Sequence, residues 1–132
     1  MFEYYKINYN WGYKQWKLSD DVLLEAIVTS DITIAEKKLI QWLNHLEKGT
    51  TSVDKQNITC WYYGGVWLYY AKNENAIFIY MHSSGEDAFD SLAYCANKIA
   101  KILYQNHTAT EIKWIEHPHR RKYLKKTTKF YK

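Results

Sequence analysis

The sequence predicts an α+β domain in which two helices pack against an antiparallel sheet, and three observations carry that prediction. Apolar residues recur at helical spacing in two segments, at about 34–48 and at about 85–105. Between these segments, three β-rich runs separated by short turn sequences predict a three-stranded meander at about 57–82. Strands and helices that are grouped in this way favour an antiparallel sheet with helices packed on it.

The bulk composition indicates one compact domain. The chain has 132 residues, of which 47% are apolar, enough for one hydrophobic core but too few for two full domains. Two cysteines, Cys60 and Cys95, are too few for a disulfide framework or a zinc finger. The chain opens without a secretory signal and holds no apolar stretch of membrane-spanning length. We therefore expect a cytoplasmic protein with no membrane span and no cofactor.

The N-terminal region predicts a hairpin followed by an ambiguous segment. The stretch "FEYYKINYNWGYKQWKL" contains two short β-rich runs around Asn10 and Gly12, which readily take turn geometry. Residues 20–31 suit two structures, because Ser19 can cap a short helix while residues 27–29 favour a strand. The sequence leaves open how the hairpin joins the rest of the domain.

The first clear helix is expected at about 34–48. Thr33, with Glu36 three residues later, matches a capping box, and Gly49 ends the apolar pattern. The side chains at helical spacing are Ala35, Leu39, Trp42, Leu43 and Leu46.

The meander has two faces that the turns define. If Gly64-Gly65 and Asn73-Glu74 are both two-residue turns, the pairing of the three strands is fixed, and a slip of one residue would exchange the faces of a strand. One face then collects Trp61, Tyr63, Val66, Leu68, Tyr70, Ile77, Ile79 and Met81. The other face collects Cys60, Tyr62, Trp67, Tyr69, Phe78, Tyr80 and His82.

A second helix and a last strand complete the domain. Ser83 and Glu86 match another capping box before the segment at about 85–105. Its apolar stripe consists of Phe89, Leu92, Cys95, Ala96, Ile99 and Leu103. The stretch "TEIKWIEH" alternates apolar and charged residues, as a half-buried strand does, until Pro118 ends it.

Charge divides the chain into a domain, residues 1–118, and a basic tail, residues 119–132. The domain carries 11 Lys/Arg against 14 Asp/Glu, a net charge of −3. The tail carries 7 Lys/Arg and no acidic residue, a net charge of +7. The tail can neutralise phosphates, contact an acidic protein, or remain a solvated chain end.

The leading functional hypothesis is a small non-enzymatic protein that binds single-stranded nucleic acid or RNA. Exposed rings on a sheet can stack on unpaired bases, while a basic segment binds the backbone. The competing structural interpretation is that the ring-bearing face of the meander forms a second core. The candidate binding residues are Tyr62, Trp67, Tyr69, Phe78, Tyr80, Arg120, Arg121, Lys122, Lys125 and Lys126.

An inhibitor or immunity-type protein that blocks another protein is the alternative from a different class. Small size, one domain and many Tyr and Trp residues suit that function, because aromatic anchors dominate interface energetics. The acidic body would then bind a basic target. Formation of a homodimer through an uncovered aromatic face is a further alternative.

Enzymatic and metal-binding readings are not favoured. His107, His117 and His119 lack further ligands at metal spacing, so we expect them to be ordinary surface histidines. Glu111-Ile112-Lys113 resembles half of a metal-dependent nuclease site, but the acidic residues available to complete it, Asp54 and Glu74, fall in predicted loops.

Overall fold

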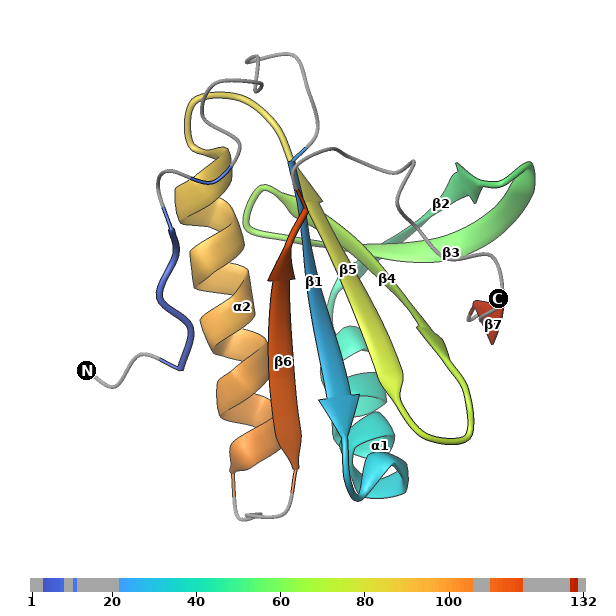
Figure 1. Cartoon of the computed structure of the whole chain (residues 1–132). Helices are drawn as coiled ribbons and strands as arrows, with labels where there is room; N and C mark the ends of the chain where they lie inside the picture. The colour runs from blue at the N-terminus through green and yellow to red at the C-terminus, as the bar shows by residue number, and fades with distance from the viewer. Residues whose placement is uncertain (1–3, 9–10, 12–21, 106–109, 118–128, 131–132) are drawn as a thin grey trace.

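The protein is an α+β domain in which two helices pack on one face of a six-stranded antiparallel sheet, as the sequence predicts (Figure 1). The computed structural model describes residues 4–8, 11, 22–105, 110–117 and 129–130. The sheet order is β2-β3-β4-β5-β1-β6, and a two-residue strand, β7, pairs with β4 off this path. The elements are β1 (Val22–Thr29), α1 (Ile32–Leu43), β2 (Glu47–Val53), β3 (Gln56–Tyr63), β4 (Val66–Lys72), β5 (Ile77–Ser83), α2 (Ala88–Tyr104), β6 (Glu111–Glu116) and β7 (Lys129–Phe130).

The segment that the sequence left ambiguous forms a central strand of the sheet. β1 lies between β5 and β6, with Ala26 opposite Ile79 on one side and Trp114 on the other. Its residues are buried on both faces, which explains its nearly continuous apolar run and the lack of a strand-like alternation.

Helix α1 is shorter than expected, and the capping box is absent. The helix follows Ser30 and Asp31, both at positive φ, and Asp31 makes no side-chain capping bond. Glu36 instead accepts hydrogen bonds from Tyr70 Oη at 3.1 Å and Lys72 Nζ at 2.9 Å. The expected end at residue 48 is wrong because residues 47–53 form β2, which pairs with β3 along its whole length. A ladder of hydrogen bonds outweighs the local helical pattern there.

The meander is confirmed, with one turn corrected. Tyr63 pairs with Val66 across Gly64-Gly65, whose φ values are positive, as a tight hairpin turn requires. Lys72 pairs with Ile77, so the next connection has four residues rather than the two expected. The difference shifts the pairing by two residues, which leaves every side chain on its expected face.

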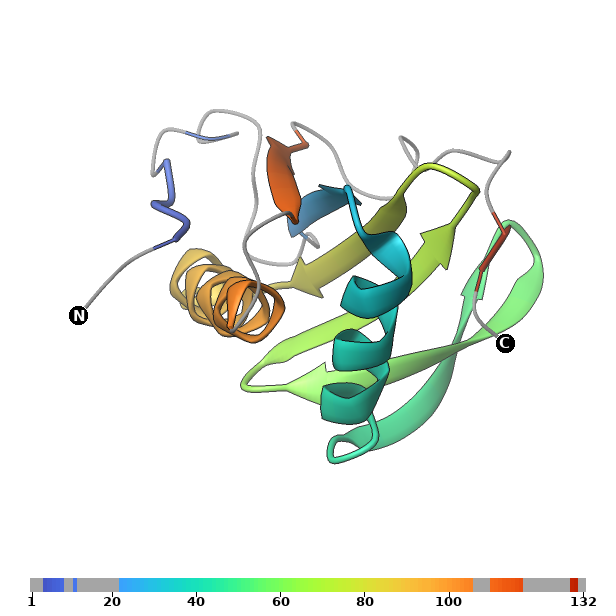
Figure 2. The same ribbon diagram turned by 90° about the horizontal axis from the view of Figure 1, so that it is seen from below.

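The two faces of the meander belong to two separate cores. The face that includes Trp61 and Leu68 packs with both helices in the main core, and Figure 2 shows the helices on this side of the sheet. The opposite face joins a second cluster, formed by Leu23, Val53, Ile58, Cys60, Tyr69, Ala71 and Tyr80. β3 pairs with β4 only over Trp61–Tyr63, and the outer part of the β2–β3 hairpin supplies Val53 and Ile58 to this cluster.

Helix α2 buries the expected stripe but lacks the expected cap. Leu92, Cys95, Ala96, Ile99 and Leu103 are all buried, and Phe89 packs partly buried against the same core. Ser83 is the last residue of β5, and its hydroxyl donates to the Gly65 carbonyl at 2.8 Å. The helix begins only at Ala88, so Ser83 and Glu86 do not form the predicted capping box.

The described part of the N-terminal region is an extended segment attached to α2. Most of the predicted hairpin lies outside the described residues, and residues 4–8 form no strand. Asn97 holds this segment: its Oδ1 accepts from the backbone N–H groups of Tyr4 and Tyr5, and its Nδ2 donates to the Tyr5 carbonyl. β6 follows α2 as expected, and among the described residues no helix has the length and apolarity needed to cross a bilayer.

Candidate functional site

The five rings proposed as a stacking surface differ in accessibility. Tyr62 is 42% exposed, and Trp67 and Phe78 are half-buried. Tyr69 and Tyr80 are each 1% exposed, because their rings lie in the second core, so this conformation does not offer them for base stacking. The basic residues Arg120, Arg121, Lys122, Lys125 and Lys126 lie outside the described residues. Lys129 and Phe130, which the sequence assigned to the tail, pair with β4 at Lys72 and Ala71.

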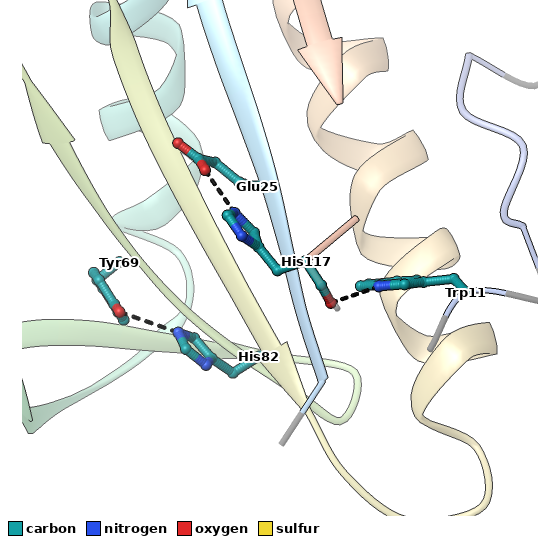
Figure 3. Close-up of polar contacts among 5 residues, drawn as sticks. All are labelled: Trp11, Glu25, Tyr69, His82 and His117. Carbon is teal, nitrogen blue, oxygen red and sulfur yellow. Dashed lines mark hydrogen bonds and ion pairs between the residues drawn. The ribbon is translucent and has the colours of Figure 1, made fainter. Parts of the chain in front are cut away.

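Trp67 is held in place by a buried histidine that sequence analysis did not single out as a site residue. The His82 ring is fully buried and stacks on Trp67, with centroids 4.0 Å apart and an interplanar angle of 8°. His82 Nε2 lies 3.1 Å from Tyr69 Oη (Figure 3). These contacts restrict the orientation of the Trp67 indole, which is half-buried.

A second polar pair on the same face corrects an expectation about His117. His117 Nε2 lies 2.7 Å from Glu25 Oε1, and the two side chains are only 12% and 8% exposed (Figure 3). The His117 backbone N–H donates to Leu23 O at 3.1 Å, and Trp11 Nε1 donates to His117 O at 2.6 Å. His117 is therefore part of a largely buried hydrogen-bonded pair with Glu25 and not an ordinary surface residue. Figure 3 shows this pair and the His82–Tyr69 pair as separate contacts.

The predicted nuclease half-site gains no support from the arrangement. Glu111 and Lys113 are exposed on β6, an edge strand, whereas Asp54 lies in the β2–β3 turn at the opposite edge. Within the described residues, no three His, Cys, Asp or Glu side chains come together to hold a metal ion.

Aromatic side chains gather on both faces around the Gly64-Gly65 turn, and we call this surface the aromatic tip; it consists of Trp42, Tyr62, Tyr63, Trp67 and Tyr94. Tyr63 is its centre on the helix side. Its ring lies edge-on to Trp42, with centroids 5.2 Å apart, and stacks on Tyr94 at 5.7 Å and 6°. Burial and a hydrogen bond with Tyr94 raise the pKa of Tyr63 to about 12, so the phenol is neutral at physiological pH. Tyr94, 66% exposed, is supported from behind by Tyr63.

Tyr62 belongs to the aromatic tip on the other face of the sheet. A Cβ built on Gly49 would lie 2.8 Å from Tyr62 Oη, so the absence of a side chain at Gly49 lets the ring lie against the β2 backbone. Cys60 Sγ lies 3.7 Å from Tyr62 Oη, and the hydrogen bond between them is the main cause that raises the pKa of Tyr62. Tyr62 pairs directly with Trp67 across the β3–β4 ladder.

Carboxylates border the aromatic tip on both faces. Glu47 is the cross-strand partner of Tyr62. Asp90 precedes Tyr94 by one helical turn, and Glu86 and Asp87 stand exposed just before α2. The tip therefore combines exposed tyrosines with carboxylates on both faces, and Lys98 follows Tyr94 by one helical turn.

Comparisons of the chain with protein-family models, with curated proteins and with solved structures found no match. The functional argument therefore depends on the geometry of this chain alone.

Proposed function

We propose that the protein is a non-enzymatic binding protein of the inhibitor or immunity type, and that it binds another protein through the aromatic tip. The exposure of Tyr62 and Tyr94 is the observation that carries the proposal. In the described part of the chain, three large hydrophobic side chains are exposed, and these tyrosines are two of them. Exposed tyrosines that are fixed by neighbouring rings contribute strongly to protein interfaces because they lose little conformational entropy on binding.

The charge around the tip favours a basic partner. Glu47, the cross-strand partner of Tyr62, and Asp90, one helical turn before Tyr94, are exposed, and residues 1–118 carry a net charge of −3. Complementary charges at the rim of an interface accelerate association and reject partners of like charge. The same carboxylates would repel the phosphates of a nucleic acid approaching Tyr62 or Tyr94. We further propose that the protein acts in the cytoplasm, with residues 119–132 as an accessory segment.

The first prediction concerns the two exposed tyrosines. In capture experiments from cells of the source organism, the wild-type protein should retain one basic protein in a stoichiometric complex. Tyr94→Ser and Tyr62→Ser should each weaken that complex roughly 30-fold or more, the loss typical of a hot-spot residue. Titration calorimetry with the recovered partner measures the loss.

Ile34→Ser provides the matched control for both tyrosine variants. Ile34 is 47% exposed on α1 and does not belong to the aromatic tip. This variant should bind the partner as the wild type does. Equal weakening by all three variants would contradict a specific role for the tip, and a protein that only associates with itself would replace the partner hypothesis with a homodimer.

Single-stranded nucleic acid is the second candidate ligand, and two observations favour it. The last 14 residues carry a net charge of +7, and the β7 segment within them pairs with β4. Two of the proposed stacking rings remain accessible: Trp67 is half-buried and Tyr62 is 42% exposed. These two residues are cross-strand partners in the β3–β4 ladder.

The second prediction tests that candidate. If the tail binds phosphates, Lys125→Gln/Lys126→Gln should weaken binding of a short fluorescent single-stranded RNA, and each lost phosphate contact should reduce the salt slope by about 0.7. Lys37→Gln/Lys55→Gln removes two exposed lysines of the body and serves as the charge-matched control. Fluorescence anisotropy measures both. The nucleic-acid proposal fails if wild-type protein shows no binding at low salt.

A further inference from the structure

A groove between the two helices has a composition unlike that of the rest of the body. Helices α1 and α2 lie on the same face of the sheet (Figure 2). A groove of about 360 Å³ is lined by residues of both helices. Seven side chains line it: Lys38, Gln41 and Trp42 from α1, His45 just after α1, Lys98 and Ile102 from α2, and Gln105 at its C-terminal cap. Trp42 follows Lys38 by four residues, and Ile102 follows Lys98 by four, so one side of each helix faces the groove.

The charge in the groove is positive and is not balanced by neighbouring acids. No carboxylate belongs to the described residues that line it, although the body as a whole is acidic. Lys38 Nζ donates to the Gln105 carbonyl at 2.5 Å, a contact that holds its ammonium group at the C-terminal end of α2. Lys98 forms no ion pair with the described residues. The Lys98 ammonium is therefore available to an anion, whereas that of Lys38 already donates to the Gln105 carbonyl.

The groove also offers apolar surface for a planar group. Trp42 is half-buried, and its edge-on contact with Tyr63 restricts the orientation of the indole. Ile102 lines the opposite helix, and the amides of Gln41 and Gln105 add hydrogen-bonding groups of both kinds. The volume lies at the lower end of the range that small-molecule sites occupy, which excludes large ligands.

We propose that this groove binds a nucleoside monophosphate or a similar small anion that carries a planar ring. The phosphate accepts charge-assisted hydrogen bonds from the Lys98 ammonium, and Lys38, held at the C-terminal end of α2, adds a second positive charge to the groove. The ring packs against Trp42 and Ile102, and the glutamine amides contact its polar edge. This site shares Trp42 with the aromatic tip, but Tyr62 and Tyr94, which carry the proposed partner contact, do not line it, so Lys98→Gln tests it separately.

Titration of the full-length protein with adenosine 5′-monophosphate, monitored by calorimetry and by ligand-observed NMR, tests the proposal. Lys98→Gln should weaken binding about fivefold, the upper end of what an exposed ion pair contributes. Trp42→Leu should also weaken binding, since it removes the ring but keeps an apolar side chain. Lys101→Gln and Lys37→Gln change the net charge equally but lie outside the groove, so both should bind like the wild type.

Two further probes separate the phosphate and ring contributions. Adenosine and inorganic phosphate should each bind more weakly than the nucleotide, because each makes only part of the contacts. The proposal is overturned if the wild type does not bind the nucleotide at millimolar concentration. It is equally overturned if Lys101→Gln weakens binding as much as Lys98→Gln, which would indicate a diffuse charge effect, or if inorganic phosphate alone binds as tightly as the nucleotide. Lys98→Gln is a surface change, so its result does not depend on whether Trp42→Leu folds.

Discussion

Replacing His117 with alanine is expected to lower the free energy of unfolding by about 3 kcal/mol, the upper end of the cost of leaving a buried polar group without its hydrogen-bond partner. The substitution leaves the Glu25 carboxylate, 8% exposed, without the imidazole that lies 2.7 Å from it. It also removes packing where β6 ends against β1, next to the Trp11 contact. Urea-induced unfolding followed by tryptophan fluorescence measures the loss.

A double-mutant cycle separates the polar interaction between Glu25 and His117 from the packing of the His117 side chain. Glu25→Gln keeps the shape of the side chain but removes its charge, so His117→Ala should cost clearly less in that background. His45→Ala, at an exposed histidine after α1, should change the stability by less than about 0.5 kcal/mol. An equal cost of His117→Ala in both backgrounds would mean that the charges do not interact.

The parts of the fold that the sequence predicts are those controlled by local patterns. The stripe of α2 and the meander show periodicities of 3.6 and 2 in the residues themselves, and the structure confirms both. The face assignment holds despite the incorrect Asn73-Glu74 turn. A two-residue change in register does not alter which face a side chain occupies, so Tyr69 and Tyr70 fall on opposite faces as predicted.

The errors arise where tertiary contacts outweigh local preference. β1 is apolar on both faces and therefore shows no alternation, and the polar residues of β2 give little strand signal although β2 pairs fully with β3. Both predicted capping boxes match the sequence pattern, yet Glu36 forms a hydrogen bond with Tyr70 of β4 and Ser83 forms one with the turn at Gly65 instead. A capping motif is a local signal that a long-range hydrogen bond can replace.

The candidate site was only partly predictable for the same reason. Tyr62 and Trp67 follow from the meander, but the stacking of Tyr63 on Tyr94 joins β3 to α2 and has no sequence signature. Glu25 and His117 are 92 positions apart, so only the β1–β6 pairing reveals them as partners. Tyr69 and Tyr80, two of the rings that the sequence analysis proposed for base stacking, belong to the second core.

Ile58→Ala is expected to lower the free energy of unfolding by about 3 kcal/mol, and this result would establish the second core experimentally. Ile58 is 1% exposed and lies in the cluster with Tyr69 and Tyr80, so truncation removes buried apolar area and leaves a cavity. If the helix-free face were instead an open stacking platform, the same truncation would cost well under 1 kcal/mol.

The control for that measurement is Ile34→Ala, the same truncation at a side chain that is 47% exposed, for which little or no loss is expected. Urea unfolding of both variants gives the difference between the two sites under identical chemistry. A small loss for Ile58→Ala would return Tyr69 and Tyr80 to the accessible surface and would make nucleic acid the leading candidate ligand. A large loss confines accessible rings on that face to Trp67, Tyr62 and Phe78, and leaves the acidic-bordered aromatic tip as the better-supported binding surface.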